Sequence, residues 1–210
     1  MRTVSAVDPI LLELPEALDG PRVRLRPYRP ADATAYWAAV EESRAHLGGW
    51  LPWVSRFRAE ADARAYVAEV AARWLLRQDL TAGVFERASG RLLGGAGLHR
   101  IDWELRSFDV GYWLRASAEG RGYMREALAL LTRLAFEVLG ANRVQVRMDV
   151  ANARSRAVAE ACGFAWEGTL RNCYLGPAGR PVDQHVLALV PAAYRALPGA
   201  GDRAADPAPR

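Results

Sequence analysis

The chain has 210 residues, of which 51% are hydrophobic and 25% charged, with a formal net charge of +4 and a pI near 9.4. This is enough chain for one globular domain with a buried core, expected over residues 1–196. All 28 Lys or Arg positions are arginine, which excludes a P-loop ending in Gly-Lys-Ser/Thr and a Schiff-base lysine mechanism.

The first predicted elements are a strand and two helices around an aromatic loop. Residues 23–28 (VRLRPY) alternate as a strand does, and a helix opens at Asp32. Residues 46–56 (HLGGWLPWVSR) combine two tryptophans with glycines and a proline, which predicts a loop with aromatic walls. Asp62 is the expected N-cap of a second helix over residues 63–76.

A strand-to-helix junction forms the predicted centre of the chain. A hairpin over residues 81–101 leads into a strand at residues 108–114 (FDVGYWL), and apolar residues then recur at helical spacing over residues 127–138. Gly120 and Gly122 lie between them. Glycines there allow a tight turn, and the free N–H groups of the helix start attract a pyrophosphate. The alternative for this Gly-x-Gly is an ordinary turn into a helix.

The second half of the chain predicts one more parallel strand and a hairpin. Residues 143–150 alternate and follow the central strand through a helix, so the two strands should be parallel. A short helix over residues 153–162 ends at Gly163, and residues 164–190 form a hairpin. Residues 197–210 are rich in Gly, Ala, Pro and Asp, which predicts a disordered tail.

Several motifs in this order resemble the GNAT family of acyl-CoA-dependent N-acetyltransferases. They are GRGYMREAL at residues 120–128 and NARSRAVAEACGF at residues 152–164. The stretch GLHRIDWELRSFDVGYWL at residues 97–114, with WLPW at residues 50–53, resembles the branch that acetylates the N-termini of ribosomal proteins. The resemblance spans residues 23–190. It implies an α/β (α+β) fold: a mixed, mostly antiparallel sheet of about seven strands, with a splayed parallel central pair and helices on both faces.

The resemblance also implies acetyl-CoA as co-substrate, with its pantetheine arm lying in the splay like a strand. A backbone N–H near Trp113 would bind the thioester oxygen, and Asn152 would hold a pantetheine amide. The residues implied to contact acetyl-CoA are Trp113, Leu114, Glu119, Gly120, Arg121, Gly122, Tyr123, Met124, Asn152 and Ser155.

Three positions depart from the family pattern. Glu119 stands where the pyrophosphate signature has Gln or Arg, and Met124 where it has Gly or Ala, although both changes leave the backbone donors in place. Ala159 stands where many members have a tyrosine that acts as general acid. The ribosomal branch implies a serine instead, and Ser155 occupies that position.

Candidate bases are few, and this favours one kind of acceptor. Asp109 is a candidate base or a structural partner of a neighbouring arginine, and His99 is a candidate base on the acceptor side or a hydrogen-bonded core residue. An α-amine is neutral about one time in ten at pH 7, far more often than lysine, so it needs little help from a base. Trp50 and Trp53 are candidate walls of the acceptor groove or plugs of the core.

Three functions fit these observations: acetylation of a protein or peptide α-amine, with ribosomal proteins as implied acceptors; acetylation of a small amine such as an antibiotic; and silent binding of acyl-CoA. Cys162 and Cys173 have no metal-type spacing, and the N-terminus has no signal-peptide pattern, so we expect a cytoplasmic protein with free thiols and no metal. We expect no membrane or direct nucleic-acid partner, and a homodimer is left open.

Overall fold

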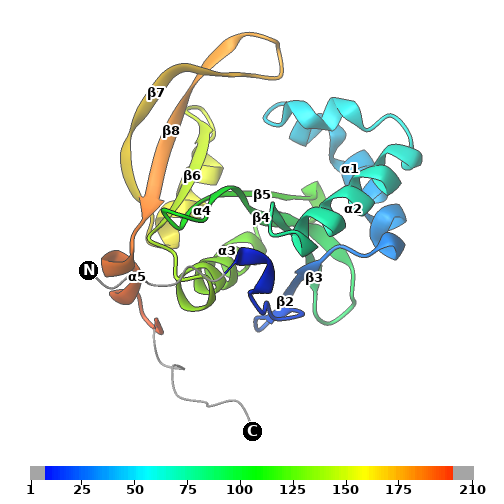
Figure 1. The fold of residues 1–210 in the computed structure, drawn as a ribbon. Coiled ribbons are helices and arrows are strands. Elements are labelled where there is room, and N and C mark those ends of the chain that lie inside the picture. Colours follow the sequence, from blue (N-terminus) through cyan, green and yellow to red (C-terminus); the bar gives the residue numbers. More distant parts are fainter. Residues whose placement is uncertain (1–7, 201–210) are drawn as a thin grey trace, which may run out of the picture.

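The computed structural model describes residues 8–200 of the chain. Its framework is one mixed sheet of eight strands in the order β1-β2-β3-β4-β5-β6-β8-β7 (Figure 1). The strands are β1 (Leu18–Asp19), β2 (Val23–Pro27), β3 (Leu80–Glu86), β4 (Leu92–Asp102), β5 (Ser107–Leu114), β6 (Arg143–Asp149), β7 (Ala165–Leu175) and β8 (Pro181–Leu189). The sheet has one strand more than the seven expected, because the two residues of β1 pair with β2.

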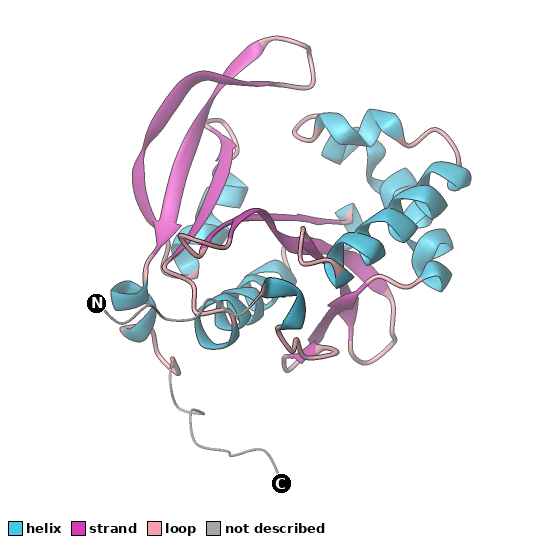
Figure 2. Ribbon diagram, in the orientation of Figure 1, coloured by secondary structure: helices cyan, strands magenta, loops and turns pink. Residues whose placement is uncertain are grey.

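Helices cover both faces of the sheet, as the sequence predicts (Figure 2). The α-helices are α1 (Ala33–Gly48), α2 (Glu60–Leu75), α3 (Tyr123–Arg133), α4 (Ala153–Ala161) and α5 (Pro191–Arg195). The 3-10 helices are η1 (Pro9–Leu11), η2 (Pro30–Asp32), η3 (Pro52–Arg56) and η4 (Ala116–Ala118), and a π-turn, η5 (Leu134–Val138), continues α3.

Two hydrophobic cores follow from the alternation of the strands. Side chains on one face, such as Leu98 and Phe108, pack with α3 in the larger core. On the other face a smaller core packs α1 and α2 against the sheet around Tyr36 and Val67. Burying such side chains contributes about 1.5–3 kcal/mol each relative to exposure. The sheet therefore stays fixed between two helical layers, which hold the ends of β5 and β6 in place.

The end of the α3 segment differs from the predicted helical stripe. Val138 was expected on the buried side, but it is 45% exposed, and Leu139 is buried instead. The N–H of Leu139 bonds to the carbonyl of Leu134, five residues back. This π-turn inserts one extra residue and rotates the chain beyond it, so the prediction for Val138 was wrong.

Two local predictions near the aromatic segment were also wrong in detail. Residues 46–56 are not a loop throughout, because α1 runs on through Gly48 and η3 forms at Pro52–Arg56. The second helix begins at Glu60, two residues before Asp62. The Asp62 carboxylate still caps this helix start, since it accepts backbone N–H bonds from Arg58 and Ala59 at 2.7 and 2.9 Å.

The first residues of the predicted tail belong to the folded body. Leu197 and Ala200 pack against the larger core. A Cβ placed on Gly163 would lie 2.6 Å from the Leu197 side chain, so this helix end is in close contact with the segment. Residues 201–210 of the predicted tail lie outside the described residues. Within residues 8–200, no helix combines the length and apolar character that a membrane span requires.

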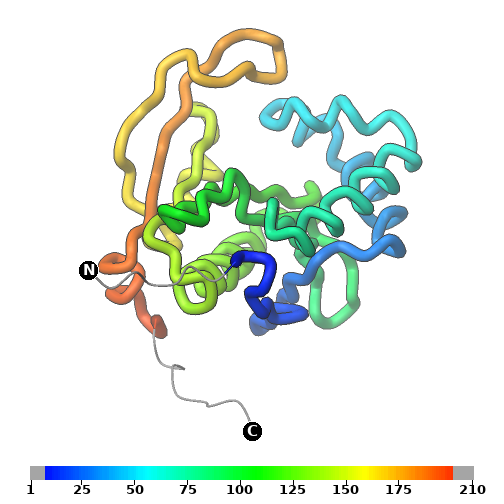
Figure 3. The backbone as a smooth tube through the Cα atoms, viewed as in Figure 1, coloured from blue at the N-terminus to red at the C-terminus, as the bar shows by residue number. Residues whose placement is uncertain are grey.

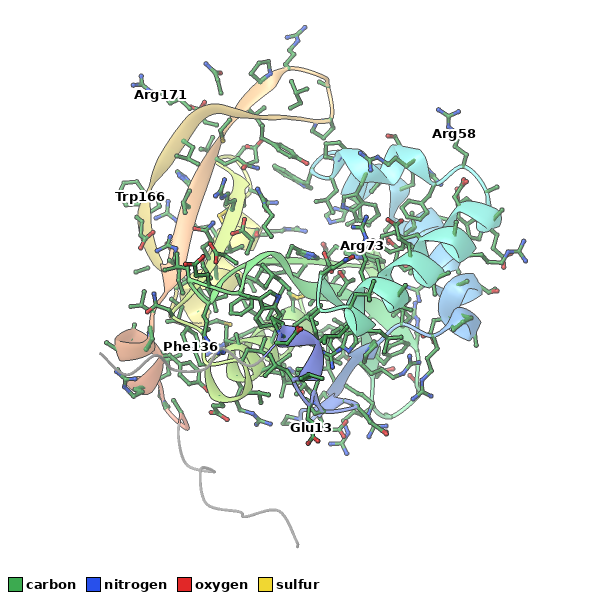
Figure 4. All side chains as sticks on the ribbon, viewed as in Figure 1. Glu13, Arg58, Arg73, Phe136, Trp166 and Arg171 are labelled. Atoms are coloured by element: carbon green, nitrogen blue, oxygen red, sulfur yellow. The ribbon has the colours of Figure 1, made fainter. Side chains whose placement is uncertain are left out.

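The hairpin of β7 and β8 extends beyond the rest of the sheet. The pairing of β6 with β8 ends at Asp149↔Gln184, whereas β7 and β8 stay paired as far as Leu175↔Pro181. Figure 3 shows this two-stranded arm on one side of β4 and β5, with the α1, η3 and α2 segment on the other. Trp166 and Arg171 project from the outer edge of β7 (Figure 4).

Candidate active site

The parallel strands β5 and β6 separate at the centre of the sheet. They pair over only four positions, from Ser107↔Arg143 to Val110↔Val146. Beyond Val110, β5 remains paired with β4, and β6 remains paired with β8. Over this stretch β5 and β6 no longer pair with each other. The backbone of residues 111–114 therefore has an open side within the sheet, where an extended ligand can hydrogen-bond as a strand does.

The glycine loop before α3 has the geometry of an anion site. Gly120 and Gly122 have φ values of 71° and 77°, in the left-handed region that favours glycine. Gly122 precedes the first turn of α3, and the N–H groups of residues 123–125 have no hydrogen-bond partner in residues 8–200. Free donors at a helix N-terminus fit a pyrophosphate. The side chain of Met124 is buried in the larger core, so its bulk does not fill the loop.

Charged side chains surround this loop in an arrangement that the sequence did not predict. Glu119 lies 2.5 Å from Nε2 of His46 and 2.7 Å from Nη1 of Arg154. Arg22 donates to the carbonyl oxygen of Arg121 at 2.8 Å. The carboxylate at the Gln/Arg position is thus paired, and two additional guanidinium groups, from Arg22 and Arg154, stand beside the loop where a phosphate would benefit from them.

Ser155 and Tyr112 form a hydroxyl pair at the open end of β5. The Ser155 hydroxyl donates to the Tyr112 oxygen at 3.1 Å, and the Tyr112 hydroxyl donates to the carbonyl oxygen of Ser155 at 3.0 Å. Burial raises the pKa of Tyr112 to about 12, so this phenol holds its proton at neutral pH. Asn152 caps α4 by accepting the Ser155 N–H at 3.0 Å, which leaves its side-chain NH₂ as a donor.

A cavity of about 520 Å³ lies on the face of the sheet that α1 and α2 cover. Five of its fifteen lining residues are Phe, Trp or Tyr, and it reaches β5 where β5 leaves β6. The lining residues are Leu51, Trp53, Arg56, Phe57, Asp62, Ala65, Tyr66, Glu69, Thr81, Gly95, Ala96, His99, Gly111, Tyr112 and Trp113. Trp53 packs edge to face on Trp113, with ring centroids 5.8 Å apart. Trp50, the other tryptophan of the predicted wall, is not among these lining residues.

His99 lies at the cavity with a carboxylate behind it. Its Nδ1 is 2.7 Å from Oδ2 of Asp79, and Oδ1 of Asp79 accepts a short hydrogen bond from Thr81. Asp79 was not predicted as a site residue. A signal for it exists in the hairpin register, since Leu80 pairs with Leu98 and the next position along each strand brings Asp79 opposite His99.

Asp109, the other candidate base, is held in a charged network. Its carboxylate accepts from Gln145 at 2.5 Å and lies 2.9 Å from Nε of Arg100 and 3.7 Å from Nε of Arg147. It is 8% exposed and is not among the residues that line the cavity. This arrangement supports the structural alternative for Asp109 and argues against its use as a base.

The sequence also predicts free thiols and no metal. Cys162 and Cys173 are both free, the first buried and the second exposed. Burial raises the pKa of Cys162 to about 11, so its thiol stays protonated at neutral pH. In the described part of the chain, no three His, Cys, Asp or Glu side chains gather where they could hold a metal ion.

A splayed parallel strand pair, with a helix N-terminus shaped for a pyrophosphate at its end, defines an acyl-CoA-dependent transferase. The chain belongs to the GNAT acetyltransferases, because the Acetyltransferase (GNAT) domain profile matches residues 22–165. The resemblance inferred from the motifs is thereby confirmed, as is the predicted fold, and the protein is an acetyl-CoA-dependent N-acetyltransferase.

Individual relatives place the chain within the family. It is 32% identical over 156 residues to YdaF of Bacillus subtilis, whose name provisionally assigns it to ribosomal N-acetylation, with 71% of this chain and 81% of YdaF covered. RimJ of Mycobacterium smegmatis, solved with CoA-disulfide, is 27% identical with a TM-score of 0.75, covering 82% of this chain and 87% of that one. The microcin C7 self-immunity acetyltransferase MccE, solved with acetyl-CoA and AMP, shares the fold at 19% identity, with a TM-score of 0.77 and 81% and 93% of the two chains covered.

Proposed function

We propose that this enzyme acetylates the N-terminal α-amine of a protein or peptide, with ribosomal proteins as the first acceptors to test. The similarity to YdaF and RimJ supports this acceptor class. The observation that carries the proposal is the position of the aromatic cavity. It meets β5 at residues 111–113, on the open side of the splay, so a chain end entering the cavity reaches the place where an extended acyl ligand would present its thioester.

The cavity wall offers polar groups and flat apolar surfaces to an amine acceptor. Asp62, Glu69 and Arg56 line it, and Glu69 is paired with Arg73 of the same helix at 2.5 Å. Carboxylate oxygens accept hydrogen bonds from an ammonium group. Trp53 and Phe57 provide flat apolar surfaces for the side chains that follow the amine.

Acetyl transfer from a thioester to an amine requires a proton donor for the leaving sulfur. The amine nitrogen forms a C–N bond to the acetyl carbon, the C–S bond breaks, the amine loses a proton, and the leaving sulfur gains one. We assign the proton donor to the Ser155–Tyr112 hydroxyl pair at the open end of β5. Both hydroxyls are protonated at neutral pH, and the side-chain NH₂ of Asn152 remains available for an amide of the ligand.

Labelled acetyl-CoA and mass spectrometry test the acceptor. A peptide library with free Ser or Ala N-termini is compared with the same peptides blocked at the α-amine but carrying a lysine, with a panel of small amines, and with no acceptor. Label on the free α-amine supports the proposal. Label mainly on lysine, or turnover only with small amines, contradicts it.

A small-amine acceptor is the second candidate, and the cavity itself favours it. Its volume of about 520 Å³ lies within the range of small-molecule sites. In the same assay this candidate predicts efficient turnover of compact amines and little turnover of peptides. The third function considered, silent acyl-CoA binding, does not apply, because the chain is a GNAT N-acetyltransferase.

A further inference from the structure

His99 at the cavity and Asp79 behind it form a pair of titratable groups whose chemistry the proposed function leaves unused. Asp79 comes from the loop between α2 and β3, and His99 from β4. Nδ1 of His99 and Oδ2 of Asp79 are 2.7 Å apart, with the two side chains 34% and 17% exposed. Burial would raise the pKa of Asp79, but the hydrogen bond and charge of His99, followed by the hydrogen bond from Thr81, hold it below its ordinary value. Asp79 therefore stays ionised at neutral pH.

An ionised carboxylate on Nδ1 fixes the state of the other ring nitrogen. A carboxylate only accepts, so Nδ1 carries the hydrogen, and neutral His99 has its lone pair on Nε2. No group in residues 8–200 hydrogen-bonds Nε2. This is the arrangement in which a carboxylate orients an imidazole as a base and stabilises the imidazolium that forms.

The free nitrogen lies beside the splay. A Cβ placed on Gly111 would be 3.1 Å from Nε2 of His99, and a Cβ on Gly97 would be 3.1 Å from its Cε1. Two glycines therefore leave room for the ring against the sheet. Gly111 is the first residue of β5 beyond its last pair with β6, at Val110. Nε2 thus faces the cavity at the point where the central strands separate.

The other two histidines lack this combination. His46 has its Nε2 on Glu119, beside the glycine loop. His185 has its Nδ1 2.9 Å from the Thr169 hydroxyl, on the β7–β8 hairpin. Neither lines the cavity.

We infer that Nε2 of His99 is the general base that takes the proton from the acceptor amine, and that Asp79 positions His99 for this step. The inference rests on the proposed function only in needing an amine acceptor. Nε2 takes a proton from the bound ammonium and passes it to water, which leaves the nitrogen with a lone pair. That lone pair forms the C–N bond as the C–S electron pair leaves with sulfur. The nitrogen then loses its second proton to water, and the sulfur gains one from the Ser155–Tyr112 pair. Asp79 stabilises the imidazolium until the proton is released to water.

A base at His99 widens the range of amines that the site can acetylate. The sequence offered no strong base, and an α-amine was favoured for that reason. With His99 in this role, a lysine side chain is no longer disfavoured for want of a base, so the choice of α-amine depends on the relatives and on the shape of the cavity.

The titratable side chains around the ring come from several elements. They are Asp79 before β3, Arg56 of η3, Asp62, Tyr66, Glu69 and Arg73 of α2, Arg100 of β4, and Asp109 and Tyr112 of β5.

The test compares His99→Gln and Asp79→Asn with the control His185→Gln, a second partly exposed sheet histidine. With any amine that the wild type acetylates, His99→Gln should lower kcat about a hundredfold or more and change the pH dependence of kcat, to which the free amine does not contribute. Asp79→Asn should lower kcat as well, because an amide donor on Nδ1 favours the wrong tautomer. Acetyl-CoA affinity should stay the same in both, and His185→Gln should behave as wild type.

Two results would overturn the inference, and each is separate from the identity of the acceptor. One is an unchanged pH profile and kcat in His99→Gln. The other comes from ¹⁵N–¹H spectra of the wild type, which need no acceptor: hydrogen on Nε2 and not on Nδ1 of neutral His99 would contradict the proposed base. If lysine or a small amine proves to be the acceptor, the proposed function fails while this test remains decisive.

Discussion

Replacing Gly122 with valine tests whether the loop before α3 binds acetyl-CoA. Gly122 has a φ of 77°, and a Cβ there would lie 3.3 Å from Nη2 of Arg22. A residue with a side chain in this left-handed conformation costs about 1–2 kcal/mol. For a chain of this size that lowers Tm by roughly 2–8 °C, so the protein should remain folded.

The effect on the ligand should be larger than the effect on the fold. If the backbone relaxes, at least one N–H of the first turn of α3 turns away from the pyrophosphate. A hydrogen bond to a charged group contributes about 1.5–3 kcal/mol, which corresponds to roughly tenfold to a hundredfold weaker binding. Isothermal titration calorimetry with acetyl-CoA measures this change directly.

Gly90→Val is the matched control. Gly90 has a φ of 72° in the turn between β3 and β4, and a Cβ there would meet nothing within 4 Å. It should lose stability by a similar amount and keep its acetyl-CoA affinity. Equal affinity for acetyl-CoA in Gly122→Val and in wild type would refute the reasoning about the loop.

Three further predictions follow from side-chain contacts. Ser155→Ala should lower kcat roughly ten- to a thousandfold with little change in acetyl-CoA affinity, and steady-state kinetics showing an unchanged kcat would reject its part in proton donation. Trp53→Ala should raise KM for the peptide more than for acetyl-CoA, whereas Trp50→Ala, outside the cavity lining, should not; equal effects would contradict the cavity as acceptor site. Burial would raise the pKa of Glu42, but hydrogen bonds from Arg115 and Ser117 lower it from 4.5 to about 2. The ionised Glu42 therefore stabilises the fold above about pH 5, and this stabilisation is lost as the pH falls to about 2. Denaturation of wild type and Glu42→Gln should therefore differ at pH 7 and converge near pH 2, and a constant difference would exclude this ion pair as the cause.

Most of the fold can be predicted from the sequence because its elements carry a clear period. The strand β6 alternates without interruption between buried and half-buried side chains, and its parallel pairing with β5 follows from the helix between them. The π-turn could not be predicted in the same way. Its insertion depends on how α3 packs against the sheet, and the local sequence around Val138 continues a helical pattern.

The sequence predicts the functional site less completely than it predicts the fold. Gly120 and Gly122 signal the loop because a special backbone conformation needs glycine there. The signal for Asp79 lies only in the pairing register of the hairpin, and the sequence does not reveal that register because it includes a shift between Val84 and Phe85. Arg154 is an exposed helix residue whose role beside the loop becomes apparent only when α4 packs next to it.

The splay between β5 and β6 places a free strand edge inside the sheet, where most proteins have none. The amides of residues 111–114 that face it can exchange hydrogen with water even though they lie at the centre of the molecule. An extended ligand that pairs with this edge joins the five strands on one side to the three on the other. By mass action, such a ligand at a hundred times its Kd stabilises the protein by about 2.7 kcal/mol. The concentration of the co-substrate therefore sets the rigidity of the sheet. The enzyme is most resistant to unfolding and proteolysis when the co-substrate is bound.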